Sequence, residues 1–227
     1  MWNGLLASRL KSQNPNQLRE TLSGLAQQGS SQNIEPLILH RFSISQHFPD
    51  NEAHTLLRDA LAGCARSNPQ ALLPLIPDNG VDAYLLLDAY FAAGGPPEPV
   101  DALLRNEKRP LSLRERMASY IVELGQVSFF IPLFRDWLTA KQRSTRVEAL
   151  RGLDAADVPD IEELLLNALY RGDTRSLRSA AATALQRRLP MRLALETEAR
   201  MVAAIGDASQ IEALGVIVLS PLMEALT

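Results

Sequence analysis

The chain has 227 residues, which is long enough for one large domain or for two small ones. Apolar residues make up 46% of it and aromatic residues only 5%, and leucine and alanine supply most of the apolar share, a composition typical of helices. The formal net charge of −3 excludes a strong overall attraction to nucleic acid or to an anionic membrane, and leaves room only for a local basic patch.

The single cysteine, Cys64, excludes an internal disulfide and fits a reducing compartment. Residues 1–17 lack the apolar run of a signal peptide, and no segment approaches 18 uncharged apolar residues. We therefore expect a soluble, cytoplasmic protein.

Residues 1–68 contain four predicted helices, which are separated by proline and glycine. Apolar residues recur within each helix at helical spacing, and breaks fall at Asn14-Pro15, Gly29 and Pro49. The predicted spans are 5–11, 16–28, 34–46 and 52–66. Their uneven spacing indicates irregular versions of the helix pairs that follow.

Regular alternation of a first and a second helix begins at Pro69. The predicted pairs are 69–76 with 81–93, 99–105 with 111–124, 127–138 with 142–153, 158–170 with 174–189, and 191–205 with 209–219. Because the connections are only a few residues long, the two helices of each pair are expected to be antiparallel neighbours. Gly125, Gly152 and Gly172 stand at or near predicted helix ends, where a left-handed cap requires glycine.

One pattern in the second helices returns at a fixed interval of 32 residues. Leu177-Arg178, Ala181-Ala182 and Ala184-Leu185 are matched by Thr145-Arg146, Ala149-Leu150 and Gly152-Leu153, by Leu113-Arg114, Met117-Ala118 and Tyr120-Ile121, and by Val81-Asp82, Leu85-Leu86 and Asp88-Ala89. Such self-similarity is the mark of a stacked repeat protein. It predicts a single all-α domain over 1–227, with irregular repeats in 1–68, regular 32-residue repeats in 69–189 and a degenerate unit in 190–227.

The second helices carry one apolar stripe, with residues at i, i+4, i+7 and i+8, which must face neighbouring helices. Small residues on this stripe, Gly152, Ala181 and Ala184, permit close helix approach. Asp88 breaks the rule, because it occupies the position that Tyr120, Gly152 and Ala184 hold in the other repeats. A carboxylate buried there needs a partner.

The stretch from Leu177 to Leu185 resembles the inner helix of a HEAT-like repeat, of the short type found in phycobilin-lyase-related proteins. The preceding helices in residues 129–138 and 158–169 are compatible with its outer helices. This resemblance to a HEAT-like, armadillo-like helical fold covers residues 69–189 best. It implies an α-α superhelix, or solenoid, of about 12–14 helices in antiparallel pairs, with the second helices on the concave side.

Five arginines stand outside the apolar stripe at repeating positions. They are Arg114, Arg146 and Arg178, and one turn earlier Arg143 and Arg175. One interpretation is a structural ladder, in which they bond acidic side chains such as Asp173 or neighbouring carbonyls. The other is a binding strip on the concave face, made partly apolar by Tyr90 and Leu150, because arginine beside exposed apolar side chains is typical of protein-binding patches.

The sequence contains no HExxH, Walker, GxSxG or dinucleotide-binding glycine pattern. His40, His47 and His54 are spaced by seven residues, but Pro49 interrupts the run, so we expect neither a metal site nor a cofactor.

HEAT-like DNA glycosylases suggest an alternative function in alkylpurine repair. Such an enzyme requires a basic groove, base-facing tryptophans and a catalytic aspartate. Here Asp136-Trp137 lies on a predicted outer helix, and Trp2 is the only other tryptophan. A bilin-lyase-like protein is a further alternative.

A repeated scaffold without a catalytic constellation favours a non-catalytic interaction module. We expect a scaffold or adaptor that binds one protein or peptide partner of acidic or amphipathic character. Nucleic acid and membrane are not expected as partners.

The apolar end Ile211–Thr227 has two acidic and no basic residues. This end either folds back as a cap or associates with another chain.

Overall fold

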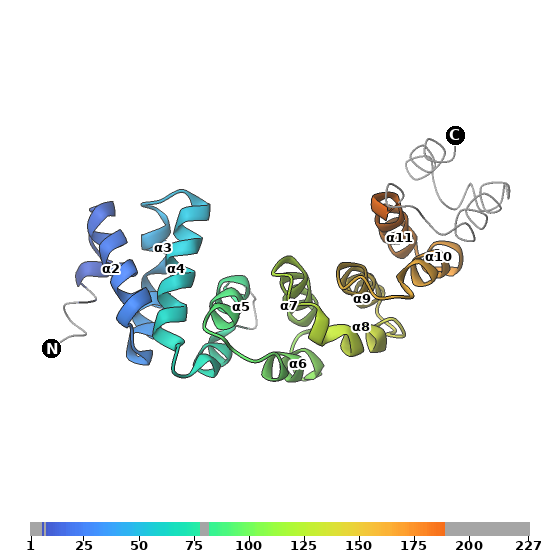
Figure 1. Cartoon of the computed structure of the whole chain (residues 1–227), viewed down its shortest axis with the longest axis horizontal. Coiled ribbons are helices and arrows are strands. Elements are labelled where there is room, and N and C mark those ends of the chain that lie inside the picture. Colours follow the sequence, from blue (N-terminus) through green and yellow to red (C-terminus); the bar gives the residue numbers. More distant parts are fainter. Residues whose placement is uncertain (1–5, 7, 78–81, 189–227) are drawn as a thin grey trace. The chain divides into compact units, whose positions relative to one another are not determined.

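The computed structural model describes residues 6, 8–77 and 82–188, and these residues form helices and connections with no β-strand among them (Figure 1). The chain is therefore all-α over this part, as its composition predicts. The predicted helix pair 191–205 with 209–219, and with it the apolar end Ile211–Thr227, lies outside the described residues. None of the described helices combines the length and the apolar character that crossing a membrane requires.

The chain divides into two compact units, Met1–Tyr120 and Ile121–Thr227. In the first, α4 (Asp50–Ala65) packs against α2 (Pro15–Gln28), α3 (Ile34–Ser45) and α5 (Ala83–Ala92). The 3₁₀ segments η1 (Ser31–Asn33) and η2 (Pro69–Leu75) also contact α4, and α6 (Glu98–Arg105) follows α5. The division falls within α7 (Leu111–Glu123).

The second unit contains the short 3₁₀ turn η3 (Ser128–Phe130) and the helices α8 (Ile131–Trp137), α9 (Arg143–Ala155), α10 (Ile161–Arg171) and α11 (Arg175–Arg188). Helix α9 packs against α8 and α11, and α10 packs against α11.

Two segments that the sequence predicts as the first helix of a pair differ in form from the prediction. The segment predicted as helix 69–76 is a 3₁₀ segment with Pro74 inside it, where in an α-helix the proline ring would clash with the carbonyl four residues earlier. The segment 127–138 starts as a 3₁₀ turn before α8 begins at Ile131.

In α7, α9 and α11 the apolar stripe is buried at the positions that the 32-residue interval predicts, whereas the corresponding Leu85 of α5 is only partly buried. Met117, Ala149 and Ala181 are 0% exposed, and so are Ile121, Leu153 and Leu185. Side chains one turn apart on one helix face thus reach the core in α7, α9 and α11 alike.

Three second helices end in a left-handed residue. Gly94 after α5 has φ +80° and Gly125 after α7 has φ +69°, and Asp157 after α9 has φ +50°. In each case the next backbone N–H donates to a carbonyl five residues earlier, as in the bond from Gln126 to Ile121 at 3.1 Å. Aspartate is one of the few residues other than glycine that tolerates this conformation.

The prediction of left-handed caps is confirmed for Gly125 and is wrong for Gly152 and Gly172. Gly172 follows α10 with φ −59°. Gly152 lies inside α9, where a Cβ would stand 2.5 Å from the Phe134 ring of α8. Gly152 therefore permits the close approach of these two helices, as its place on the apolar stripe predicts.

Candidate functional site

Arg114, Arg146 and Arg178 make the same contact in their three repeats. Each guanidinium donates from Nη1 to a carbonyl at the end of the preceding helix or just after it. The acceptors are Leu104 at 3.3 Å, Ala140 at 3.1 Å and Gly172 at 2.9 Å, in the same order. Carbonyls at a helix end have no partner within their own helix, so these arginines satisfy them and tie the two helices of each pair together.

Arg146 also forms the acidic contact that the ladder interpretation names. Its Nη2 lies 2.7 Å from Oδ1 and 2.8 Å from Oδ2 of Asp173, in the connection between α10 and α11. The Arg146 side chain is only 17% exposed, which leaves little of it for a partner. Arg114, Arg146 and Arg178 are accordingly positioned as structural arginines.

Arg143 and Arg175 are placed differently. Both are exposed, and their side chains make no ion pair or hydrogen bond with a residue that the structure describes. They begin α9 and α11, so each lies one turn before a residue of the same helix face, Val147 in α9 and Ser179 in α11. These two guanidinium groups are available to bind an anionic group.

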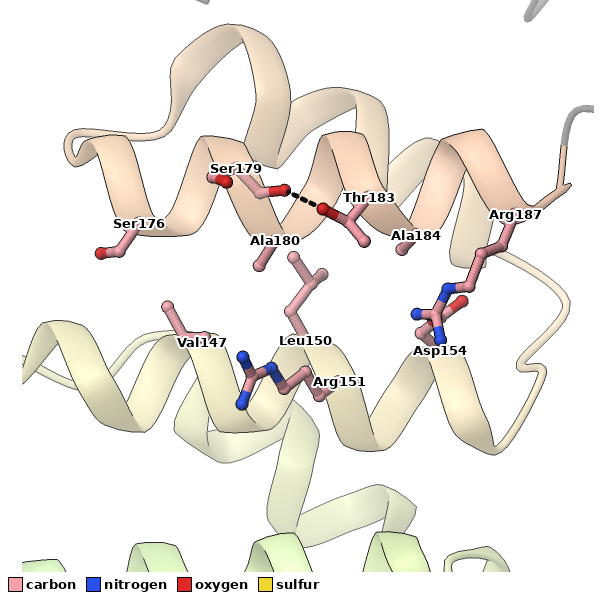
Figure 2. A pocket seen from close by; sticks show the side chains of 10 residues that line it. All are labelled: Val147, Leu150, Arg151, Asp154, Ser176, Ser179, Ala180, Thr183, Ala184 and Arg187. Atoms are coloured by element: carbon pink, nitrogen blue, oxygen red, sulfur yellow. Dashed lines mark hydrogen bonds and ion pairs between the residues drawn. The ribbon is translucent and has the colours of Figure 1, made fainter. Parts of the chain in front are cut away.

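Val147 and Ser179 belong to a groove between α9 and α11 with a volume of about 320 Å³ (Figure 2). Its other lining residues are Leu150, Arg151, Asp154, Ser176, Ala180, Thr183, Ala184 and Arg187. Small side chains on α11 leave the hollow open, and apolar side chains from both helices line it. We refer to it as the α9–α11 groove.

The two ends of the α9–α11 groove differ in charge. Figure 2 shows Val147 and Ser176 at one end and Asp154 and Arg187 at the other, so α9 and α11 run in the same direction. At the far end Asp154 accepts from Arg187 at 2.7 Å and from Arg188 at 2.8 Å, which neutralises the carboxylate. The near end joins two helix N-termini to Arg143 and Arg175, and each N-terminus carries a partial positive charge. This end is therefore electropositive.

The two apolar residues expected on the strip lie in the core. Tyr90 is 0% exposed, and its hydroxyl donates to the Pro96 carbonyl at 2.5 Å. Burial raises the pKa of Tyr90 above its ordinary value. Leu150 is 1% exposed and lies at the floor of the α9–α11 groove. The prediction that these two side chains make the arginine strip partly apolar is therefore wrong, because packing against neighbouring helices covers both of them.

Asp88 has the partner that its position requires. His54 on α4 lies with Nε2 2.9 Å from Oδ2 of Asp88, and the side chains are 30% and 16% exposed. Arg58 adds a longer contact of 3.9 Å to the same oxygen. The His54 ring also contacts the Tyr84 ring in a tilted arrangement, with centroids 5.0 Å apart. The sequence signalled the need for a partner but could not identify it, because His54 belongs to the irregular repeats.

The residues considered for other functions are also placed. Trp137 of α8 is 8% exposed and packs edge-on against Phe134, so it does not offer a face for stacking on a base. Among residues 6, 8–77 and 82–188, no three histidine, cysteine or acidic side chains are grouped so that they could hold a metal ion.

No family model, curated protein or solved structure matches this chain.

Proposed function

We propose that the chain is a non-catalytic binding module of the cytoplasm whose helices stack as a HEAT-like solenoid and whose α9–α11 groove holds a segment of a protein partner. The observation that carries the proposal is a groove with an apolar floor together with two exposed arginines, Arg143 and Arg175, each of which stands one turn before a lining residue of its own helix and has no partner among the described residues. Repeat scaffolds use such surfaces between successive helices for binding, which supports the assignment.

The volume and the lining of the groove determine the size and the chemical character of the partner segment that it can hold. About 320 Å³ lies at the lower end of the volumes of ligand sites, so it accepts one or two side chains and no large folded element. Its floor of Val147, Leu150 and Ala180 suits a small aliphatic side chain. Hydroxyl groups of Ser176 and Ser179 on the α11 rim can bond a peptide backbone.

The arginines define the charge of the segment. A guanidinium group presents parallel N–H donors that match a carboxylate, so Arg143 and Arg175 favour an acidic side chain beyond the end of the groove. The partner segment is thus amphipathic, with an aliphatic residue in the groove and an acidic residue next to it.

The test is an affinity capture of partners from the native organism with the full chain, quantified by mass spectrometry. One variant reverses the free charges (Arg143→Glu with Arg175→Glu), and a second fills the groove (Ala180→Leu). Both should lower recovery of the specific partner about tenfold or more, which corresponds to about 1.4 kcal/mol of binding free energy.

The matched control reverses two other exposed cations, Arg171→Glu with Lys108→Glu, and changes the net charge by the same amount. It should retain the partner, and all variants should keep the melting temperature of the parent chain. A partner that is bound equally by the parent chain and by both groove variants would refute the proposal. Excision of alkylated bases from DNA by the purified chain would also refute it, in favour of the glycosylase alternative.

A further inference from the structure

A second hollow, with a volume of about 530 Å³, lies in the first unit beside α2. Its lining includes Leu6, Arg9, the α2 residues Glu20 and Gly24, and Gln32 of η1. The volume is in the range of small-molecule sites. Since α9 and α11 take no part in it, this pocket is independent of the proposed peptide groove.

Gly24 is the feature of this pocket that the fold does not explain. It lies inside α2, where glycine costs about 0.5–1 kcal/mol relative to alanine. A Cβ at this position would meet no atom within 4 Å, so neither packing nor a left-handed backbone requires the glycine. The missing side chain instead leaves the helix backbone open to the pocket, which is what close approach of a bound molecule requires.

The polar groups around the pocket fall into two kinds. Thr21 donates its hydroxyl to the Gln17 carbonyl at 2.7 Å, and Ser30 bonds Asn33 at 3.1 Å, so these groups serve the local structure. Arg9 and Glu20 are exposed, and their side chains have no ion pair or hydrogen bond with any residue in the described part of the chain, including each other. Two opposite charges at one pocket, neither of them paired with a described residue, match a ligand that carries both charges itself.

The amides of Gln28 and Gln32 add to this match. Both residues line the pocket and their side chains, like those of Arg9 and Glu20, have no hydrogen-bond partner among the described residues. A carboxamide both donates and accepts, which is the pattern that complements a peptide bond. The Leu6 and Leu25 side chains supply an apolar surface for a ligand side chain.

We propose that this pocket binds a short peptide with free termini, with the carboxylate at Arg9, the ammonium group at Glu20, and the backbone passing over Gly24. The guanidinium group provides paired donors for the carboxylate, and the Glu20 carboxylate accepts from the ammonium group.

The probe is the dipeptide alanyl-leucine, titrated into the ¹⁵N-labelled full chain up to about 10 mM, where a Kd of about 1 mM would give near-saturation. We expect saturable shifts of backbone amide signals in residues 20–33. The N-acetylated and the C-amidated dipeptides should each bind about tenfold more weakly or worse, because each lacks one of the two charges. Absence of saturable shifts with alanyl-leucine overturns the proposal, and so does a blocked dipeptide that binds as tightly as alanyl-leucine itself.

Variants distinguish the pocket from a nonspecific surface. Gly24→Leu keeps a good helix former in α2 and fills the hollow, so it should weaken binding about tenfold or more without lowering the melting temperature. Ser23→Leu adds a leucine at the adjacent exposed position outside the pocket lining and should bind as the parent chain does. Unchanged affinity in Gly24→Leu overturns the assignment, and so does equal weakening in both variants.

Discussion

Replacing Gly152 by alanine tests the packing of α8 against α9. The added Cβ would stand 2.5 Å from Cδ2 and Cε2 of Phe134, whereas carbon atoms in optimal contact are about 3.5–4.0 Å apart. Phe134 is 0% exposed and its ring meets Trp137 edge-on with centroids 6.4 Å apart, so it has no free direction in which to move by the required ångström. Such overpacking costs about 1–3 kcal/mol.

Gly24→Ala is the matched control, because Gly24 is also a helical glycine and its added Cβ would meet no atom within 4 Å. Both variants gain the helix propensity of alanine, about 0.5–1 kcal/mol, so their difference isolates the overpacking cost. At about 2–4 °C per kcal/mol for a chain of this size, Gly152→Ala should melt about 2–12 °C below Gly24→Ala in a thermal scan monitored by circular dichroism.

A second substitution checks the assigned cause. Phe134→Leu removes the ring that the added Cβ would strike. It should therefore lower the free energy of unfolding less in the Gly152→Ala variant than in the parent chain. If Gly152→Ala is as stable as Gly24→Ala, or if the two substitutions at 152 and 134 are additive, the close approach of α8 and α9 at Gly152 is refuted.

Three further predictions concern buried or half-buried side chains. Burial raises the pKa of the Cys64 thiol from 9.0 to about 11, so its contribution to stability is complete below pH 9 and is lost as the pH rises through 11. The free energy of unfolding should therefore fall about 2 kcal/mol more between pH 8 and pH 10.5 in the parent chain than in Cys64→Ala, and equal slopes would contradict this. Tyr90→Phe removes the buried bond to the Pro96 carbonyl and should lower the free energy of unfolding in urea by about 1–3 kcal/mol, whereas a neutral effect would show that this bond contributes nothing. For His54 and Asp88, a double-mutant cycle with alanine should give a coupling of about 0.5–3 kcal/mol, and simple additivity would mean that the pair is not formed in solution.

The sequence by itself determined the all-α class, the approximate position of each described helix and the buried stripe of the second helices. These features depend on local spacing, since apolar residues at helical intervals and proline or glycine breaks act within one helix. The 32-residue interval also placed Arg114, Arg146 and Arg178 at equivalent positions, and they make equivalent contacts.

Tertiary structure decided which of the repeated residues are available to a partner. Exposure depends on how much of a side chain the neighbouring helix covers. Leu150 lies two turns after Arg143 on the same face of α9, yet Leu150 is buried whereas Arg143, like Arg175 in α11, is exposed. The role of Gly152 and the choice of His54 as the partner of Asp88 likewise depend on contacts across 18 and 34 residues, which spacing along one helix does not encode. The α9–α11 groove exists because small side chains of α11 face α9. Its lining residues come from both helices, and only the packing of α11 against α9 brings them together.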